Sequence, residues 1–574
     1  MNWTSMLTKK HLQLISIVFL TITVFAFSLE VPFYLDDFRN IKENPLLVTG
    51  SLNDFLWQNR FIGTLTFFFQ YQLDIASLQA FHIVNIVIHL INVIVIYFLT
   101  HEISQKLDLD TNWLPVFTAA LFAIHPLNSQ PVIYIVQRYT LLAAMFYLSA
   151  TLIYFHLRDA LQNNQSKYFI ILSITLISLI ILGWFSKQNM ASIFFVLFIT
   201  ELIFYQKNIN YKKFLAHFSI ALFSLFALAF VMRDSELMSL IDLASRETND
   251  ITRTEYFLAQ LNILWIYIGK FYWPTNLRLE YSLHSESFSL FITVISALAH
   301  IGLLAIALIL FKKRPVITFS ILFYYTSHLV ESSIIPIRDF AFEHRTYIPN
   351  FALSLATSYL LLKVFTLKSK HNFVMPATMI LIISTLSIMS VYRVQLWGDK
   401  LAFLENERIH SPNNIRVLTS LAKAHRDRGN QPISNQLIEL AFNLSGSDIR
   451  ADVAANYIAM LVETNQVTKA NAVVNRVLPT IKDWPSKSLI LHNLAVLNHQ
   501  NKLLDKSTLL LEQVLKSPAP IPDSYYLMSI IALQQKKMAR AEYYSKELIT
   551  KYPNYQKGIQ LFKSINLAKT KFKE

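Results

Sequence analysis

The chain has 574 residues, of which 53% are hydrophobic, and its mean hydropathy is +0.38. A soluble domain rarely keeps a positive mean hydropathy over such a length, so the composition favours membrane spans of roughly 20 apolar residues each. The formal charge of +14 lies largely beside apolar runs, where membrane orientation explains it, so we expect no nucleic-acid partner. Because the chain has no Cys, a disulfide framework and a thiolate metal site are excluded.

The apolar runs predict a polytopic membrane bundle, and the first run begins soon after Lys9 and Lys10. That run is long, has no small-residue cleavage site and leads into further apolar segments. We therefore expect an uncleaved anchor rather than a signal peptide. The hydropathy predicts about 11 spans in total. They cover residues 12–29, 80–100, 113–125, 132–157, 167–185, 190–206, 214–232, 289–311, 315–333, 348–366 and 373–392.

Lysine residues lie in alternate connections between these spans. They are Lys9, Lys10, Lys106, Lys167, Lys207, Lys212, Lys213, Lys312, Lys313, Lys368 and Lys370. By the positive-inside rule these connections are cytoplasmic, which places the N-terminus inside and the C-terminal part of the chain outside. One apolar segment, 256–272, does not fit, since a full span there would move Lys312 and Lys313 outside. We expect it to be re-entrant or to lie in the outer interface.

From about residue 398 the apolar content drops, and short amphipathic helices alternate with turns. The turns lie near Gly429-Asn430, Asn465-Gln466, Asn501-Lys502 and Lys536-Lys537, about 35 residues apart. This period resembles the tetratricopeptide repeat, in which pairs of helices stack into a solenoid with a concave binding surface. The expected fold class is therefore all-α, with a membrane bundle at 1–397 and a helical repeat domain, outside the cytoplasm, at 398–574.

Asp36 and Asp37 follow the first span in the sequence "VPFYLDDFRNIKENPLL". An exposed acidic turn that is merely solvated is one interpretation of this pair. The other is a catalytic carboxylate, because Phe33, Tyr34 and Phe38 beside the pair would partly desolvate it. Desolvation raises the pKa of a carboxyl group and makes it a stronger base.

A polar stripe crosses the next span, where His82, Asn85, His89 and Asn92 follow one another at helical spacings of three, four and three. Such a stripe faces the bundle interior or a wet cavity. Hydrogen bonding between helices is the favoured interpretation, and direct contact with a substrate is the alternative. No carboxylate accompanies the two histidines, so we expect no metal site.

Further polar groups lie where later spans meet the outer surface. They are His125, Gln137, Arg138, Lys187, Glu343, His344 and Arg345. Side chains reaching toward lipid headgroups would explain isolated cations. Several cations that converge on one outer face would instead hold a phosphate or diphosphate, which arginine binds with two hydrogen bonds.

Five segments occur in one order along the chain: "DDFRNIKENP", "FHIVNIVIHLINVIVIYFL", "LFAIHPLNSQPVIYIVQRYTLLAAMFYL", "LGWFSKQN" and "FEHRTYIP". With the C-terminal repeats, this set resembles the transmembrane-and-tetratricopeptide protein O-mannosyltransferases and their bacterial relatives. The resemblance implies a GT-C fold glycosyltransferase in a bacterial inner membrane. It implies a polyprenyl-phosphate sugar donor, with no cofactor beyond this lipid-linked substrate.

The resemblance also implies roles for individual residues. Asp36 or Asp37 would be the catalytic carboxylate, and the donor phosphate would lie against Arg138, Lys187, His344 and Arg345. Apart from the resemblance, the positions of five further polar residues make them candidates for lining a substrate cavity: His82, His89, His125, Gln137 and Glu343. The family's "SKE" motif reads Ser186-Lys187-Gln188 here, and the missing carboxylate weakens the case for a metal in this loop, although a divalent metal is not excluded.

We therefore expect a membrane glycosyltransferase that moves a sugar from a polyprenyl-phosphate carrier to an acceptor outside the cytoplasm, most simply a Ser or Thr hydroxyl of a protein. The repeats would bind that protein or a partner, and the bundle would contact membrane lipids. One alternative keeps the enzyme class and changes the acceptor to a lipid, glycan or cell-envelope polymer. The other alternative is a transporter or an assembly scaffold without enzymatic activity.

Overall fold

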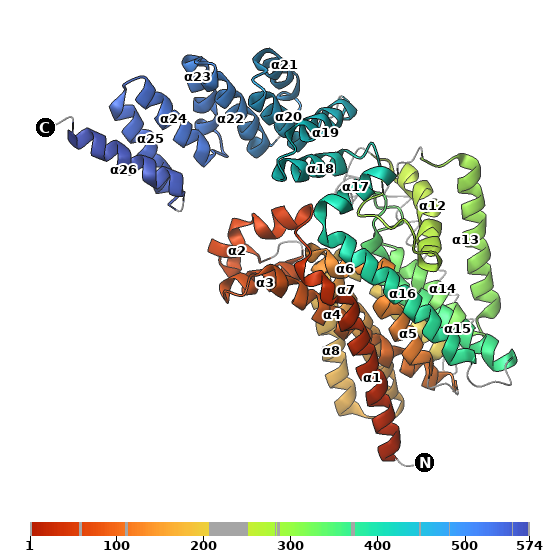
Figure 1. Ribbon diagram of the computed structural model, residues 1–574. Helices are drawn as coiled ribbons and strands as arrows, with labels where there is room; N and C mark the ends of the chain where they lie inside the picture. Colours follow the sequence, from red (N-terminus) through yellow and green to blue (C-terminus); the bar gives the residue numbers. More distant parts are fainter. Residues whose placement is uncertain are drawn as a thin grey trace, which may run out of the picture. The chain divides into compact units, whose positions relative to one another are not determined.

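The computed structural model describes residues 3–571 except 57–59, 110–112, 206–250, 282, 284–286, 369–373, 447–448, 482 and 554. Over these residues the secondary structure is helical and contains no strand, as predicted. The chain divides into two compact units, Met1–Phe403 and Leu404–Glu574 (Figure 1). The boundary predicted after residue 397 lies close to this division. The functions assigned to the two parts stay predictions.

The first unit is a bundle of helices joined by short 3-10 or π-helical turns. Its longer helices are α1 (Trp3–Phe25), α3 (Phe61–Gln72), α4 (Leu78–Lys106), α5 (Trp113–Ile124), α7 (Arg138–Gln162), α8 (Ser166–Trp184), α9 (Ile193–Phe204), α12 (Arg253–Tyr272), α13 (Leu290–Leu310), α14 (Pro315–His328), α15 (Pro349–Lys368) and α16 (Val374–Gly398). The short elements are η1 (Ala26–Glu30), η2 (Phe38–Lys42), α2 (Pro45–Thr49), η3 (Leu52–Asp54), η4 (Pro126–Asn128), α6 (Ser129–Ile133), η5 (Ile135–Gln137), η6 (Gln188–Ser192) and η9 (Glu343–Thr346). α17 (Lys400–His410) crosses the division between the units.

Local sequence signals explain where several of these helices begin. The Ser77 hydroxyl accepts the N–H of Ala80 and so caps the first turn of α4. Thr252 and Glu255 form a capping box at the start of α12, in which each side chain accepts the other residue's N–H. α14 begins with Pro315, which has no N–H to leave unpaired at that position.

Six helical segments of the described chain are long and apolar enough to cross a bilayer, which is consistent with a multi-pass membrane protein. They are His11–Glu30, Leu78–Lys106, Ile135–Gln162, Ser166–Trp184, Leu290–Leu310 and Val374–Gly398. Each coincides with a predicted span. Predicted spans at 113–125 and 190–206 correspond to the shorter apolar helices Trp113–Ile124 and Gln188–Phe204. The span at 214–232, with Lys207, Lys212 and Lys213, lies outside the described residues, so the total of about 11 spans stays a prediction.

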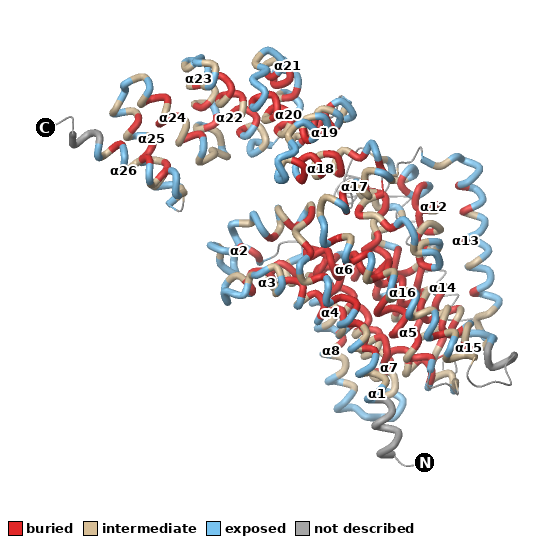
Figure 2. The backbone as a smooth tube through the Cα atoms, viewed as in Figure 1, coloured by how far each residue is buried: buried red, intermediate tan, exposed pale blue. Residues whose placement is uncertain are grey.

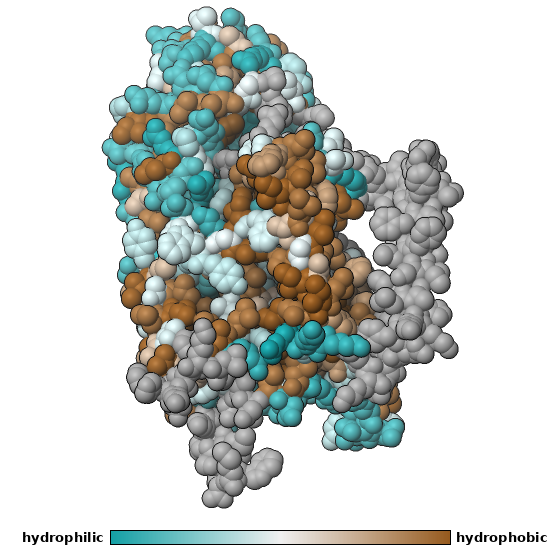
Figure 3. All heavy atoms as spheres, turned by 90° about the vertical axis from the view of Figure 1, so that its right-hand side faces the viewer, coloured by the Kyte–Doolittle hydropathy of each residue, from teal (hydrophilic) through white to brown (hydrophobic). Residues whose placement is uncertain are grey.

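Three of the six segments have a mostly exposed apolar surface. Only 11% of the apolar windows of α8 and α16 and 22% of that of α13 is buried, whereas 56% of the window of α4 is (Figure 2). Leu290 and Phe291 of α13 are 75% and 74% exposed, and the side of the molecule on which α13 lies has a broad hydrophobic surface (Figure 3). A surface of this kind is stable in contact with lipid and not with water.

The segment at 256–272 lies within α12, a continuous helix of 20 residues that packs against α13 and α15. A re-entrant hairpin would need a turn within this segment, and the helix has none. A place in the outer interface, the second expectation, stays a prediction.

The second unit consists of successive antiparallel helix pairs followed by a last helix. The helices are α18 (Ile415–Asp427), α19 (Gln431–Leu444), α20 (Ala451–Glu463), α21 (Val467–Val477), α22 (Trp484–Gln500), α23 (Leu504–Lys516), α24 (Pro522–Gln534), α25 (Met538–Lys551) and α26 (Gln556–Lys571). Each helix packs against its partner in the pair, and neighbouring pairs pack against each other. The predicted solenoid and its assignment to the tetratricopeptide family stay predictions.

The recurring turns share one backbone conformation. Gly429, Asn465, Lys502 and Lys536 each have a positive φ, between 55° and 79°. At each turn the next residue's N–H reaches back to a carbonyl in the last turn of the preceding helix at 2.8 Å, for example from Asn430 to His425. This left-handed cap ends a helix and reverses the chain, which explains why turn residues recur at these positions.

Gly63 of α3 allows close contact with α7. A Cβ atom at this position would lie 2.0 Å from the Tyr139 ring, whereas nothing lies within 4 Å of a Cβ at Gly302. We expect Gly63→Ala to destabilise the purified protein by about 1–3 kcal/mol, because the ring must move. The control Gly302→Ala should leave the melting temperature unchanged or slightly higher. Equal melting temperatures for the two variants in detergent would contradict this packing.

Candidate functional site

The loop after the first span is fixed by the carboxylate of Asp37. This side chain is fully buried, and its two oxygens accept the backbone N–H of Tyr34 at 3.0 Å and of Val136 at 2.7 Å. Val136 belongs to η5, which leads directly into α7. The Tyr34 hydroxyl donates to the carbonyl of Trp397 at 2.5 Å, and the two rings are in contact. The loop is thereby held against the start of α7 and the end of α16.

Asp36 is exposed, in contrast to its neighbour. Its backbone N–H donates to the Tyr134 hydroxyl at 2.9 Å, which fixes the main chain at this residue. The direction of the Asp36 carboxylate is therefore set by the turn. The ammonium of Lys400 lies 4.7 Å from the centre of the Phe38 ring, next to the same turn. The structure thus separates the acidic pair into one buried and one accessible carboxyl group.

Burial raises the pKa of Asp37 to about 8. The two backbone N–H groups oppose this shift, as does the charge of Lys400, while the charge of Asp36 adds to it. Asp37 is fully buried and each of its oxygens already accepts a backbone N–H, so a substrate hydroxyl cannot approach it. Of the two candidates, Asp36 has the accessibility that a base needs.

The polar side chains of the α4 stripe form hydrogen bonds with neighbouring segments. Hydrogen bonding of this kind is the interpretation that their spacing favours. The Asn85 amide donates to the carbonyls of Val132 and Ile135, and both ring nitrogens of His89 are bonded, to Tyr347 and to the Ala123 carbonyl. Asn92 donates to the Leu141 carbonyl and to the Tyr347 hydroxyl. His82 Nε2 bonds the Val31 carbonyl, and its Nδ1 is buried with no hydrogen-bond partner among the described residues.

Arg138 is buried at the start of α7 and is occupied by protein groups. Its N–H groups donate to Asn85, Thr66, Gln70 and the Phe81 carbonyl, at 2.7–3.1 Å. Its guanidinium also lies 4.0 Å from the centre of the Phe67 ring. Since four of its five N–H groups are used in this way, its main contribution is to tie α3 and α4 to α7.

Lys187, predicted as a phosphate ligand, is buried beside the same end of α7. Its ammonium donates to the Thr140 hydroxyl at 3.1 Å and pairs with Glu331 at 2.7 Å. Burial lowers the pKa of Lys187, and the charge of Glu331 opposes that shift. The cation is therefore held between α7 and the segment after α14.

His344 and Arg345 lie in η9 and converge on Lys187. Burial lowers the pKa of His344 well below its usual value, and the nearby charges of Lys187 and Arg345 lower it further. The guanidinium of Arg345 donates to the Tyr256 hydroxyl and to the carbonyls of Glu331, Phe340 and Asp339. Lys187, His344 and Arg345 are thus brought together as the sequence predicts, and Arg138 lies in a separate set of contacts.

Arg60 is an exposed cation at the edge of this group, and no sequence pattern indicated it. It lies close enough to Lys187, His344 and Glu331 to interact with each electrostatically. Its guanidinium lies 5.4 Å from the centre of the Tyr139 ring. The N–H of Ile62 donates to the Phe185 carbonyl at 3.1 Å, which fixes the start of α3 against the Lys187 loop.

Glu343 belongs to a different buried network. It pairs with Arg393 of α16 at 2.5 Å and accepts hydrogen bonds from the Tyr281 hydroxyl and the Arg278 N–H. Burial raises the pKa of Glu343, while Arg393 and these donors oppose the shift. These contacts join α16 to η9 and to the segment that follows α12. They do not by themselves indicate that Glu343 lines a substrate cavity.

The two remaining predicted cavity residues also have partners within the bundle. His125 stacks on Phe271 at 4.3 Å, donates through Nε2 to that residue's carbonyl, and accepts the Leu127 N–H through Nδ1. The amide oxygen of Gln137 accepts the Thr140 hydroxyl at 2.8 Å. Within the described chain, no group of three or more His, Asp or Glu side chains has an arrangement that could hold a metal ion.

The chain matches no known family model. It is similar to a protein O-mannosyl-transferase from Caenorhabditis elegans, with 23% identity over 440 residues. The alignment covers 73% of this chain and 60% of the relative, so the chain spans less than two thirds of the relative's length. This similarity supports the resemblance to the O-mannosyltransferases that the motifs indicate. A bacterial origin and the tetratricopeptide assignment stay predictions.

The Glu343–Arg393 pair provides a test of the buried network. Glu343→Gln should destabilise the protein by about 3–5 kcal/mol, because it leaves the Arg393 charge buried without its partner. In the control, Glu439→Gln removes the partner of Lys469, and this exposed pair should be worth about 0–1 kcal/mol. Thermal unfolding of the two purified variants measures the difference. A loss at Glu343 no larger than that at Glu439 would contradict the arrangement.

Proposed function

We propose that the protein is a membrane glycosyltransferase that transfers a sugar from a polyprenyl-phosphate carrier to a protein hydroxyl outside the cytoplasm. The observation that carries the proposal is the convergence of an acidic loop and a cation cluster on the N-terminal end of α7. There Val136 binds Asp37, Tyr139 faces Arg60, and Thr140 binds Lys187. Glycosyl transfer needs a base for the acceptor and positive charge for the leaving phosphate.

In this proposal Asp36 is the general base and Asp37 is a positioning residue. The exposed Asp36 carboxylate would take the proton of the acceptor hydroxyl as its oxygen attacks the anomeric carbon. The bond from that carbon to the carrier phosphate breaks, and the phosphate leaves with the negative charge. Asp37, with both oxygens occupied by backbone N–H groups, holds the turn on which Asp36 lies.

The donor phosphate would lie against Arg60 and Lys187, with His344 and Arg345 behind them. Arg60 is exposed and can reach the phosphate directly, whereas Arg345 is occupied by four protein acceptors. Glu331 is the carboxylate that pairs with Lys187, and the Arg60 and Arg345 charges around that pair favour an anion. The lipid tail would extend into the bilayer along the apolar helices.

The acceptor assignment rests on the similarity to a protein O-mannosyl-transferase and on the helix pairs of the second unit. The lysine distribution supports a cytoplasmic N-terminus and an outer location for both the Asp36 loop and the repeats. The repeats would recruit the protein acceptor or a partner.

The two aspartates should behave differently on substitution. Asp36→Asn should lower the transfer rate by roughly 100- to 10,000-fold through loss of the base, with an unchanged melting temperature. Asp37→Asn should lower both the rate and the melting temperature, because an amide NH2 cannot accept the backbone N–H that one carboxylate oxygen now accepts. The assay uses purified protein in nanodiscs, polyprenyl-phosphate mannose and a Ser/Thr peptide, with mass spectrometry of the product. Near-native turnover of Asp36→Asn would refute its role as the base.

The cation cluster is tested through donor kinetics. Arg60→Gln and Lys187→Gln should each raise the KM for the lipid-linked donor and lower kcat, since the leaving phosphate gains charge in the transition state. Arg338→Gln is the matched control, because Arg338 is also exposed and lies in a loop of the same unit. Donor kinetics that change equally in all three variants, or in none, would exclude a phosphate site at Arg60 and Lys187.

A further inference from the structure

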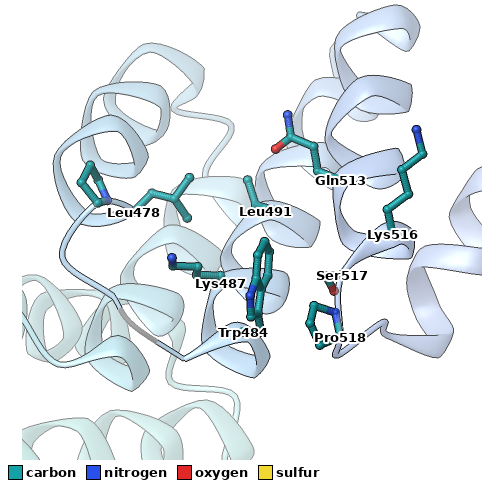
Figure 4. Close-up of a pocket in the computed structure, with 9 residues that line it drawn as sticks. Leu478, Trp484, Lys487, Leu491, Gln513, Lys516, Ser517 and Pro518 are labelled. Carbon is teal, nitrogen blue, oxygen red and sulfur yellow. The ribbon is translucent and has the colours of Figure 1, made fainter.

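The second unit contains a pocket of about 590 Å³ that the proposed chemistry does not use. It lies where the end of α21, the start of α22 and the end of α23 meet (Figure 4). Its walls are mainly apolar and include Leu478, Leu491 and Pro518, with Trp484 standing between the two sides. A volume of this size accommodates a large side chain together with the peptide backbone beside it.

The walls of this pocket are rigidly held. Trp484 is the first residue of α22, whose N-terminus is capped by Asp483 through the N–H of Ser486 at 2.9 Å. The hydroxyls of Ser488 and Ser517 are 3.0 Å apart and join α22 to the end of α23. Trp484 is nevertheless 42% exposed, a large value for a tryptophan in a packed helical unit. A rigid aromatic group that is accessible in a recess is typical of an interaction hot spot.

The charged side chains that line the pocket are both lysines. Lys487 lies with its ammonium 5.4 Å from the centre of the Trp484 ring, and Lys516 lines the opposite side. None of the described lining residues is acidic. From residue 404 onward the sequence has 23 Lys and Arg against 14 Asp and Glu, so the whole unit is basic. An apolar recess between two lysines in a basic unit is complementary to an apolar group flanked by carboxylates.

We propose that this pocket binds a peptide segment in which a large apolar side chain, best an aromatic one, is flanked by Asp or Glu. The side chain stacks on Trp484 between Leu478 and Pro518, and the carboxylates pair with Lys487 and Lys516. A membrane surface is less well matched, since the tryptophan lies within a recess. The binding does not depend on the transferase activity, so each can fail without the other.

The test measures binding to the full-length protein in nanodiscs of neutral lipid, by fluorescence anisotropy of a labelled peptide. The probe has one Phe between two Glu on each side. Two control peptides replace Phe by Ala or the four Glu by Lys. We expect the probe to bind, both control peptides to bind at least about tenfold more weakly, and added salt to weaken binding of the probe.

Variants locate the site. Trp484→Ala and the pair Lys487→Gln with Lys516→Gln should each weaken binding of the probe at least about tenfold. Trp484→Phe keeps an aromatic ring and should retain most of the binding. Comparing it with Trp484→Ala shows whether binding is lost with the ring or because the unit no longer folds. Lys557→Gln, at an exposed lysine on α26, should bind like the native protein. Equal binding by all variants, equal binding of the three peptides, or binding to anionic vesicles without binding of the probe would each overturn the proposal.

Discussion

The carboxylate of Asp37 joins the loop after the first span to the N-terminal end of α7, and the arrangement of the site depends on this contact. The two N–H donors come from residues far apart in sequence, Tyr34 and Val136. Because both are backbone groups, the contact fixes the path of the chain as well as the position of a side chain. Asp36, the preceding residue, is turned outward as a result. The buried carboxylate of Asp37 thus positions the exposed carboxylate of Asp36.

The same end of α7 also organises the cations. Arg138 ties it to α3 and α4 through buried hydrogen bonds, and Thr140 holds the ammonium of Lys187. Buried polar groups in an apolar bundle are stable only when their partners are in place. Displacing this end of the helix would therefore disturb the acidic loop and the cation cluster together. These contacts hold the irregular segment 126–137, whose residues are all buried, in place.

The sequence predicted those features that depend on local periodicity. Spacings of three and four along α4 identified the stripe from His82 to Asn92, and the recurring turns of the second unit lie at its left-handed helix caps. Pairings between distant segments were not predictable, since no spacing relates Lys187 to Glu331 or Glu343 to Arg393. Arg393 carried little signal, because it directly follows the span predicted at 373–392, where a side chain reaching toward lipid headgroups explains a cation. Arg60 carried none, because its role depends on the contact between the start of α3 and the Phe185 carbonyl.

The central claim is that Asp36 and Arg60 face one aqueous space on the outer side of the membrane. The natural chain has no Cys, so the single-cysteine variants Asp36→Cys and Arg60→Cys can each be labelled without further substitutions. A membrane-impermeant maleimide applied to intact cells that express these variants should label both positions before the cells are opened. Labelling of either position only after the cells are opened would place the two groups on different sides, or both inside, and would contradict the account.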